Sequence, residues 1–262
     1  MAAQSEAHLF HEIRQTLRVT GVHPALRDWP FLADLWDAVR PNAETRAFEE
    51  AAARIRAEAV TAADQLGRVA SLARAQLGES QAYHVETSLM LYHYLNPKLL
   101  LLASAAAAGC KGEPHASDVP LIERGAPARM AILELEDGRP ADEEVKRVYR
   151  EARRVLGTPE VPVELRTLAL WPRYLSASWE RLKPLARSGA FSRASRHILE
   201  LSQALARSLP FPTAPLASRE VLALESSLPK SIVLVSLLAL DWQAPELLRR
   251  SPFPARPRGR HH

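Results

Sequence analysis

The sequence predicts an all-α protein, and two observations lead to that fold class. Apolar residues recur every three or four positions along most of the chain, for example at Ala47, Ala51, Ile55 and Ala59, which is the spacing of one helix face. Alternating runs rich in Val, Ile and Thr, which are typical of strands, are absent. The expected helices cover residues 5–17, 42–77, 82–95, 142–156, 175–185, 192–209 and 218–226, with Pro-containing connections at 113–127, 157–163 and 210–217.

Composition indicates an ordinary globular protein of the cytoplasm. The chain has 262 residues, of which 47% are hydrophobic and 24% charged, enough for one large or two modest domains. The N-terminus has no apolar run behind a basic start, so no signal peptide is expected. The longest apolar runs, 99–110 and 232–240, are shorter than the ~20 residues of a membrane span. The single cysteine, Cys110, forms no internal disulfide, and we expect it to be structural.

Charge and motifs exclude several kinds of partner. The 34 Lys and Arg and 30 Asp and Glu residues are mostly interleaved, which is typical of a solvated surface. The basic segment at 249–262 is rich in proline and is not matched by stacking aromatics on a basic stripe, so nucleic acid is not an expected partner. His8 and His11 lack the further ligands that a metal site needs. The chain also lacks a Gly-rich phosphate loop, so we expect neither a metal nor a nucleotide cofactor.

Two motifs occur twice in the same order, which predicts a pseudo-two-fold arrangement of two helical repeats. WPFLADLWDAVRP at 29–41 resembles WPRYLSASWERLKP at 171–184. LNPKLLLLASA from Leu95 is echoed by LPKSIVLVSLL from Leu228, and in both we expect Pro-Lys to open an apolar helix. Ligand sites favour the interface between such halves. The predicted boundaries are a first repeat at 1–112, a linker at 113–141, a second repeat at 142–254 and a basic tail at 255–262, in one compact unit.

Four short motifs in order resemble those of the group I α-haloacid dehalogenases, also called the D,L-2-haloacid dehalogenase family. They are TLRV at 16–19, NPKLLLLASA at 96–105, LRTLALWPRYL at 165–175 and SPFP at 251–254. The resemblance implies an all-helical pseudo-dimer that hydrolyses small 2-haloacids without a metal or a covalent ester. It also implies that an Asp activates the attacking water, that an Asn helps to hold it, and that both substrate enantiomers react with inversion.

The resemblance assigns catalytic roles to Asn96 and Glu164. Asn96 matches the family's water-holding Asn, and an amide offers both a donor and an acceptor to a water. The alternative is that Asn96 only caps a helix whose first residue is Pro97. Glu164 and Val163 stand where the family has Asp and Ser, so the carboxylate is kept but displaced by about 1 Å, and a serine contact to the substrate carboxylate is lost. The alternative for Glu164 is an exposed acid near a helix start.

The predicted substrate-binding residues depart from the family in the first repeat. The family has aromatic residues after its Arg-Val, whereas this chain has Gly21 and Pro24 in an apparently shorter segment. Trp29 would partly refill the pocket, or belong to the core. Arg166 and Lys98, next to the predicted catalytic residues, would attract a substrate carboxylate, or be solvated as most basic side chains are.

Two functions follow from these patterns. The first is cofactor-independent hydrolytic dehalogenation of a small-molecule carboxylate by an activated water. The alternative is a diverged homologue that binds or processes another small acid, or an interaction protein on the same helical scaffold. The departures at Val163, at Glu164 and in the first repeat favour the alternative, whereas Asn96 and the retained carboxylate favour hydrolysis. A homodimer of the whole chain is left open.

Overall fold

The protein is all-α in the part of the chain that its computed structural model describes. The described residues are 2–21, 23, 26, 31–68, 74–112, 119–127, 130, 132, 140, 142–216 and 218–250. The helices are α1 (Ala2–Leu17), α3 (Leu32–Ala43), α4 (Arg46–Leu66), the 3-10 turn η1 (Arg74–Gln76), α5 (Glu79–Ala108), α6 (Glu143–Leu156), α7 (Val163–Leu168), α8 (Pro172–Ala186), α9 (Gly189–Arg207), α10 (Arg219–Ala239) and α11 (Pro245–Arg249).

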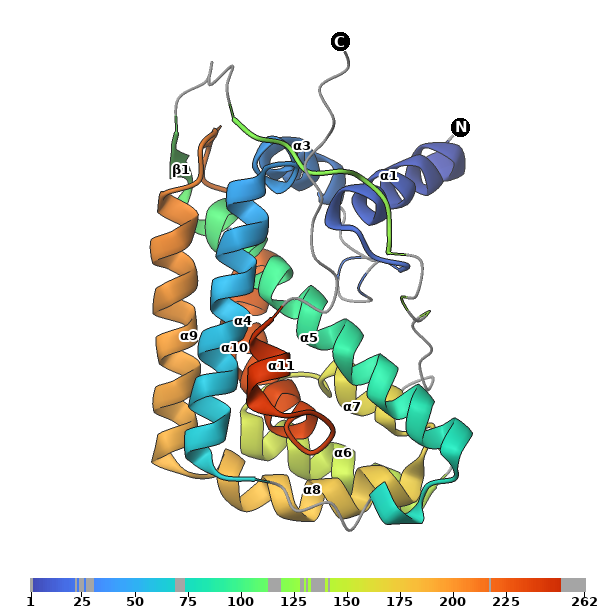
Figure 1. Cartoon of the computed structure of the whole chain (residues 1–262). Helices are drawn as coiled ribbons and strands as arrows, with labels where there is room; N and C mark the ends of the chain where they lie inside the picture. Colours follow the sequence, from blue (N-terminus) through green and yellow to red (C-terminus); the bar gives the residue numbers. More distant parts are fainter. Residues whose placement is uncertain are drawn as a thin grey trace.

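Four long helices form the centre of the molecule. Helices α4, α5, α9 and α10 all pack against one another, and Figure 1 shows α4 and α9 running side by side. Helices α1 and α3 lie at one end of this group, while α6 and α8 lie at the other. The apolar faces of all these helices join in one continuous core. The predicted fold class is therefore confirmed.

Helix α5 is one continuous helix of 30 residues, so Pro97 lies inside it rather than at its start. Pro229 is likewise inside α10. The expectation that Pro-Lys opens a helix is wrong, and so is the interpretation of Asn96 as a helix cap. A proline inside a helix opposes it by ~3 kcal/mol. Every residue from Ser88 to Ala106 is buried, so packing of α5 outweighs this local preference.

Helix α4 is shorter than the helix expected at 42–77. It begins after Thr45, whose side chain accepts a hydrogen bond from the backbone N–H of Phe48, and it ends before Gly67. Gly67 has φ of +111°, a conformation that other residues rarely adopt. A glycine within an amphipathic run therefore ended the helix where periodicity alone predicted that it continued.

Two very short strands correct the expectation that strands are absent. Strand β1 (Cys110–Lys111) pairs antiparallel with β2 (Pro212–Thr213), with Cys110 opposite Thr213. They tie the end of α5 to the segment after α9. Cys110 is buried, and burial raises the pKa of its thiol, which agrees with a structural role.

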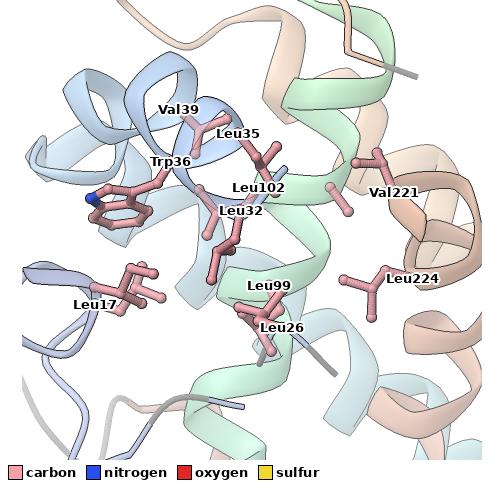
Figure 2. Close-up of a pocket in the computed structure, with 12 residues that line it drawn as sticks. Leu17, Leu26, Leu32, Leu35, Trp36, Val39, Leu99, Leu102, Val221 and Leu224 are labelled. Carbon is pink, nitrogen blue, oxygen red and sulfur yellow. The ribbon is translucent and has the colours of Figure 1, made fainter. Parts of the chain in front are cut away.

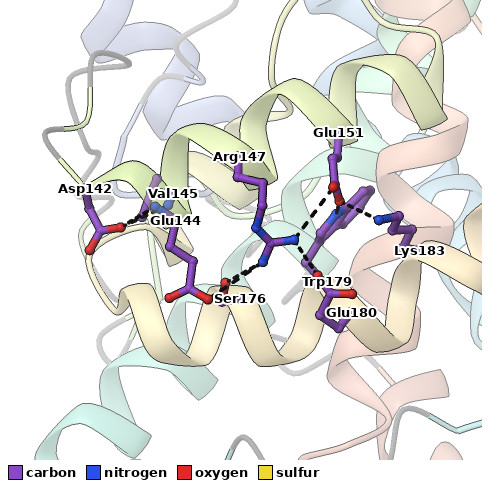
Figure 3. A network of polar contacts seen from close by, with 9 residues as sticks. All are labelled: Asp142, Glu144, Val145, Arg147, Glu151, Ser176, Trp179, Glu180 and Lys183. Atoms are coloured by element: carbon purple, nitrogen blue, oxygen red, sulfur yellow. Dashed lines mark hydrogen bonds and ion pairs between the residues drawn. The ribbon is translucent and has the colours of Figure 1, made fainter.

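Helices α6 and α8 are joined by the polar contacts drawn in Figure 3. Oε2 of Glu151 accepts hydrogen bonds from Nε1 of Trp179 at 2.9 Å and from Nζ of Lys183 at 2.8 Å. Arg147 adds a bond of 2.6 Å to Glu180. The aromatic nitrogen and the cation lie four residues apart on α8, so one glutamate of α6 fixes a full turn of α8.

Helices α1 and α3 are joined by contacts of the same kind. Glu12 of α1 accepts hydrogen bonds from Nε1 of Trp36 at 3.3 Å and from Arg40 at 2.7 Å. Trp36 is buried and Arg40 is half-buried, again four residues apart on one helix. Each end of the molecule thus uses a glutamate, a tryptophan and a cation to join two helices.

The predicted linker is described only in part. Its segment at 119–127 pairs with the junction between α3 and α4, where Arg46 N–H donates to the carbonyl of Pro120 at 2.8 Å and Ile122 N–H to that of Glu44 at 3.0 Å. Most of 113–141, the tail at 255–262 and the SPFP motif at 251–254 lie outside the described residues.

Helix α10 is the one described helix long and apolar enough to cross a membrane by length and composition. Most of it is buried against α4, α5 and α9, as expected for the core helix of a soluble protein. Burial among other helices therefore explains its apolar sequence.

Candidate active site

The predicted catalytic residues meet where α5, α7 and α10 come together. Asn96 from α5 and Glu164 from α7 are 0% and 1% exposed, and Ser231 from α10 lies beside them. The interpretation of Glu164 as an exposed acid is therefore wrong. Helix α7 starts after Pro162, and Glu164 lies in its first turn. The turn points this carboxylate into the protein because Leu165 and Leu168 anchor α7 in the core.

Hydrogen bonds hold the Glu164 carboxylate from two helices. Nδ2 of Asn96 donates to Oε1, and Oγ of Ser231 donates to Oε2 at 3.3 Å. Oδ1 of Asn96 is buried and has no hydrogen-bond partner among the described residues. A buried acceptor of this kind calls for a donor, which a water molecule supplies. The pair thus presents a carboxylate and an amide oxygen close together.

Burial raises the pKa of Glu164 because the charged form loses its hydration. The hydrogen bonds from its backbone, Asn96 and Ser231 lower the pKa in the opposite direction, but burial is the larger effect. Among the described residues, no basic group lies within ion-pair distance of this carboxylate. Glu164 is therefore a stronger base than an exposed glutamate, which suits the removal of a proton from water.

A second pair of polar side chains lies next to this site. The hydroxyls of Tyr92 and Thr167 are 2.7 Å apart and buried. Tyr92 precedes Asn96 by four residues, so it lies on the same face of α5, and Thr167 follows Glu164 by three, so it lies on the same face of α7. Burial raises the pKa of the Tyr92 phenol, which keeps it protonated. The ring of His23 contacts Tyr92 edge-on, with 6.4 Å between centroids.

Sequence reasoning missed Ser231, Tyr92 and Thr167. For Tyr92 and Thr167 the helical spacing from Asn96 and Glu164 was an available signal. Ser231 follows the second Pro-Lys pair directly, but nothing local distinguishes it from the other serines of the chain. Its role depends on how α10 packs.

Lys98 is not available to a substrate carboxylate. Its Nζ forms an ion pair of 2.7 Å with Glu49 and donates to the carbonyl of Leu17 at 2.8 Å and to the Tyr94 hydroxyl at 2.7 Å. An ammonium group has three N–H donors, so all are used. Burial lowers the pKa of Lys98 to about 8, although the charge of Glu49 raises it. Lys98 therefore joins α1, α4 and α5 rather than binding substrate.

The other predicted substrate-binding residues lie at different depths. Val163 is half-buried at the first position of α7, and Arg166 is half-buried one turn later. Gly21 is half-buried in the segment that follows α1. Pro24 and Trp29 lie outside the described residues.

Figure 2 shows an apolar cavity between α1, α3, α5 and α10. Leu99 and Leu102 line it from α5, one to two turns after Asn96, and Leu26 lines it from the segment before α3. Its volume of about 20 Å³ accommodates roughly one water molecule. Neither Asn96 nor Glu164 lines it. Among the described residues, no group of three or more His, Cys, Asp and Glu side chains could hold a metal ion.

Solved structures place the fold among the D-2-haloacid dehalogenases. A mutant D-2-haloacid dehalogenase in complex with D-2-CPA superposes with a TM-score of 0.77, at 19% identity, over 91% of this chain and 92% of that one. The complex of D-2-haloacid dehalogenase with L-LA gives the same TM-score and coverage. The fold is therefore shared with these enzymes.

Sequence comparisons give the family. The (R)-2-haloacid dehalogenase of Rhizobium sp. (strain NHG3) is 26% identical over 189 residues, which cover 70% of this chain and 73% of that protein. The configuration-inverting 2-haloacid dehalogenase of Pseudomonas sp. (strain 113) is 26% identical over 210 residues, covering 74% and 68%. The family model "Halocarboxylic acid dehydrogenase DehI" matches residues 27–164, more than half of the chain. The chain belongs to this family, as the four motifs predicted.

Proposed function

We propose that the protein hydrolyses small 2-haloalkanoic acids by direct attack of an activated water, without a cofactor. The observation that carries this proposal is the buried contact between Asn96 and Glu164 in a family whose relatives are 2-haloacid dehalogenases. The two residues lie 68 positions apart in the sequence, so the fold brings together a base and an amide.

In the proposed reaction Glu164 is the general base. Its carboxylate takes a proton from the water, whose oxygen forms a bond to the α-carbon of the substrate. The carbon–halogen bond breaks, and its electron pair leaves with the halide. Oδ1 of Asn96 accepts the second hydrogen bond of the water and holds it in line. Ser231 orients the carboxylate through Oε2.

Val163, Gly21 and Arg166, together with Pro24 and Trp29, are the residues we propose for substrate binding. The charge of Arg166 would attract the substrate carboxylate, whereas Val163 offers only an apolar contact where the family has a hydroxyl. We expect the enzyme to be soluble and cytoplasmic. Whether two chains pair into a homodimer is left open. Neither a membrane nor a nucleic acid has a part in this reaction.

We also infer that the molecule is built from two homologous repeats. The support is a set of matched contacts. Lys98 donates to the carbonyl of Leu17, the last residue of α1, and Lys230 donates at 2.7 Å to that of Leu156, the last residue of α6. Thr45 and Ser188 each accept a bond from the N–H three residues later, at the start of α4 and α9. The two Glu-Trp-cation groups make a third match.

Halide release from D- and L-2-chloropropionate tests the proposal. We expect the unmodified protein to release chloride from both enantiomers, and Glu164→Gln, which preserves shape but not basicity, to lose activity by at least about 100-fold. Glu164→Asp restores the family's residue and is the matched control for geometry. Release that persists in Glu164→Gln would contradict the role of this carboxylate.

The diverged homologue remains the second candidate, favoured by Glu164 and Val163 at the family's Asp and Ser positions. This candidate predicts no chloride release from the unmodified protein with either enantiomer. It also predicts that 2-chloropropionate does not compete with the ligand that the protein binds. A gain of release in Glu164→Asp alone would mean that the scaffold was retained for another small acid.

A further inference from the structure

A larger cavity lies in the second half of the molecule, away from the Asn96–Glu164 pair. Its volume is about 390 Å³, and it lies between the end of α6, the start of α9 and the middle of α10 and is partly open to solvent. Leu156, Phe191 and Leu199 are among its apolar walls. Cavities of roughly 300–1,000 Å³ hold small organic ligands.

Three basic side chains and no acidic ones line this cavity. Arg154, Arg196 and Lys230 come from α6, α9 and α10. Among the described residues, none of the three has an acidic partner within ion-pair distance, whereas Arg147 and Lys183 nearby are paired with glutamates. Arg154 and Arg196 are exposed and Lys230 is half-buried, so these cations line a partly open cavity. Uncompensated cations along such a cleft attract an anion.

The dipole of α6 explains only part of this charge. Lys230 caps the carbonyl of Leu156, and Arg154 lies in the last turn of α6, where cations are favourable. Arg196 belongs to the second turn of α9, so it neither caps a carbonyl of α6 nor lies near the C-terminal end of a helix dipole. Ser195 beside it is 6% exposed, and its buried hydroxyl has no hydrogen-bond partner among the described residues. A buried hydroxyl left without a partner inside a cavity lining indicates a missing polar group.

The corresponding place in the first half of the molecule is filled by the protein's own carboxylate. In the first half, Tyr94 lies four residues before Lys98 and Glu49 lies four residues after Thr45, the residue at the start of α4. Serines replace both in the second half: Ser226 four residues before Lys230, and Ser192 four residues after the helix start. The small side chains leave open the space in which the first half holds a phenol and a carboxylate.

We propose that this cavity binds a small monocarboxylate with an apolar body, whose carboxylate takes the place beside Arg154, Arg196 and Lys230 that Glu49 takes beside Lys98. The apolar walls receive the hydrocarbon part, and the Ser195 hydroxyl donates to the anionic head. The site is separate from Asn96 and Glu164, so it does not depend on the proposed reaction.

Titration calorimetry of the full chain with hexanoate tests this site, with hexanamide as the uncharged probe. We expect saturable hexanoate binding that weakens with added salt, and binding of hexanamide at least about tenfold weaker. Arg196→Gln and Arg154→Gln each weaken hexanoate by about tenfold. Ser192→Glu, which supplies an internal carboxylate at an exposed position, weakens it at least as much. Glu164→Gln leaves it unchanged.

Matched controls separate the cavity from general charge effects. Arg193→Gln and Arg153→Gln remove exposed charges beside the cavity residues, and Ser192→Gln adds size without charge; each stays within about twofold of the unmodified protein. Absence of saturable hexanoate binding overturns the proposal. Equal weakening by the control variants overturns it too. A changed affinity for hexanoate in Glu164→Gln, tighter or weaker, overturns it as well, because it would place hexanoate at the Asn96–Glu164 pair.

Discussion

Lys98 and Lys230 make the same contact to the end of a helix but lie in different surroundings. Both lysines follow a proline inside a long core helix, and both donate to the last carbonyl of another helix. Around Lys98 the space is filled by Glu49 and Tyr94, whereas around Lys230 a cavity of about 390 Å³ is lined by cations and serines. The first place is a closed, internally neutralised contact, and the second is open and basic.

This difference shows that a lysine can cap the last carbonyl of a helix whether or not a neighbouring carboxylate neutralises its charge. Lys98 is 1% exposed, so its charge requires the carboxylate of Glu49. Lys230 is half-buried, and solvent lowers the free energy of its charge without a partner. The second half can therefore keep the cap and leave the adjoining space to a ligand.

The same substitution at both lysines is expected to give the largest contrast. Lys98→Met leaves Glu49 buried without a counter-charge and should lower the free energy of unfolding by about 3–5 kcal/mol. Lys230→Met loses one hydrogen bond to a carbonyl and should lower it by about 1 kcal/mol. Urea unfolding measures both.

A double variant provides the control for this contrast. Lys98→Met combined with Glu49→Leu removes both charges, so most of the lost free energy of unfolding should return. Equal losses in Lys98→Met and Lys230→Met would contradict the distinction between the two places.

His93, in the first half, should contribute strongly to the pH dependence of stability. Burial, with a contribution from the nearby charge of Arg56, lowers the pKa of His93 to about 3. The unfolded chain takes up this proton near pH 6.5, so it binds more protons than the folded protein between pH 6.5 and about 3. Stability therefore falls as pH falls through this window, by about 2 kcal/mol between pH 7 and 5 from His93 alone.

His93→Gln isolates this contribution. The raised pKa of Glu164 acts in the opposite direction, because the folded protein takes up that proton first, but it is common to both proteins and cancels in their difference. Five residues before Lys230 the second half has Glu225, not histidine. If the free energy of unfolding changes with pH between 7 and 5 by the same amount in His93→Gln as in the unmodified protein, this assignment is wrong.

The smallest expected effect concerns the ends of α1 and α6. Arg18 and Gly157 follow these helices with φ of +59° and +62°. A Cβ on Gly157 would meet only Nζ of Lys230, at 3.9 Å, which is an ordinary contact. Gly157→Ala should therefore cost about 1 kcal/mol from backbone conformation alone. Thermal unfolding checks this, and a loss well above that value would mean that the end of α6 is packed more tightly than its contacts suggest.

Much of the fold was predictable because helical periodicity is strong throughout this chain. The ends of the helices were less predictable. Helix α5 continues through Pro97 because burial on both sides outweighs the local preference, whereas α4 ends at Gly67 within an otherwise periodic run. The paired motifs that predict two repeats can be read from the sequence, but their Pro-Lys pairs lie inside helices and not, as the sequence had predicted, at helix starts.

The candidate site was predictable only where motifs existed. Asn96 and Glu164 came from the family resemblance, and their contact spans 68 residues, which no local pattern encodes. Ser231 and the occupation of Lys98 by Glu49 depend on the packing of α10 and α4 against α5. Such contacts follow from tertiary structure, so the sequence alone gave no signal for them.

A single-turnover reaction in ¹⁸O-labelled water, with protein in excess over 2-chloropropionate, tests the central claim most directly. Direct attack by a water that Glu164 activates predicts lactate labelled in its hydroxyl oxygen in the first turnover, with no label in Glu164 by mass spectrometry of the peptide. Unlabelled lactate with label appearing in the Glu164 carboxylate would show attack by the carboxylate itself and contradict the account. Absence of lactate would contradict it as well.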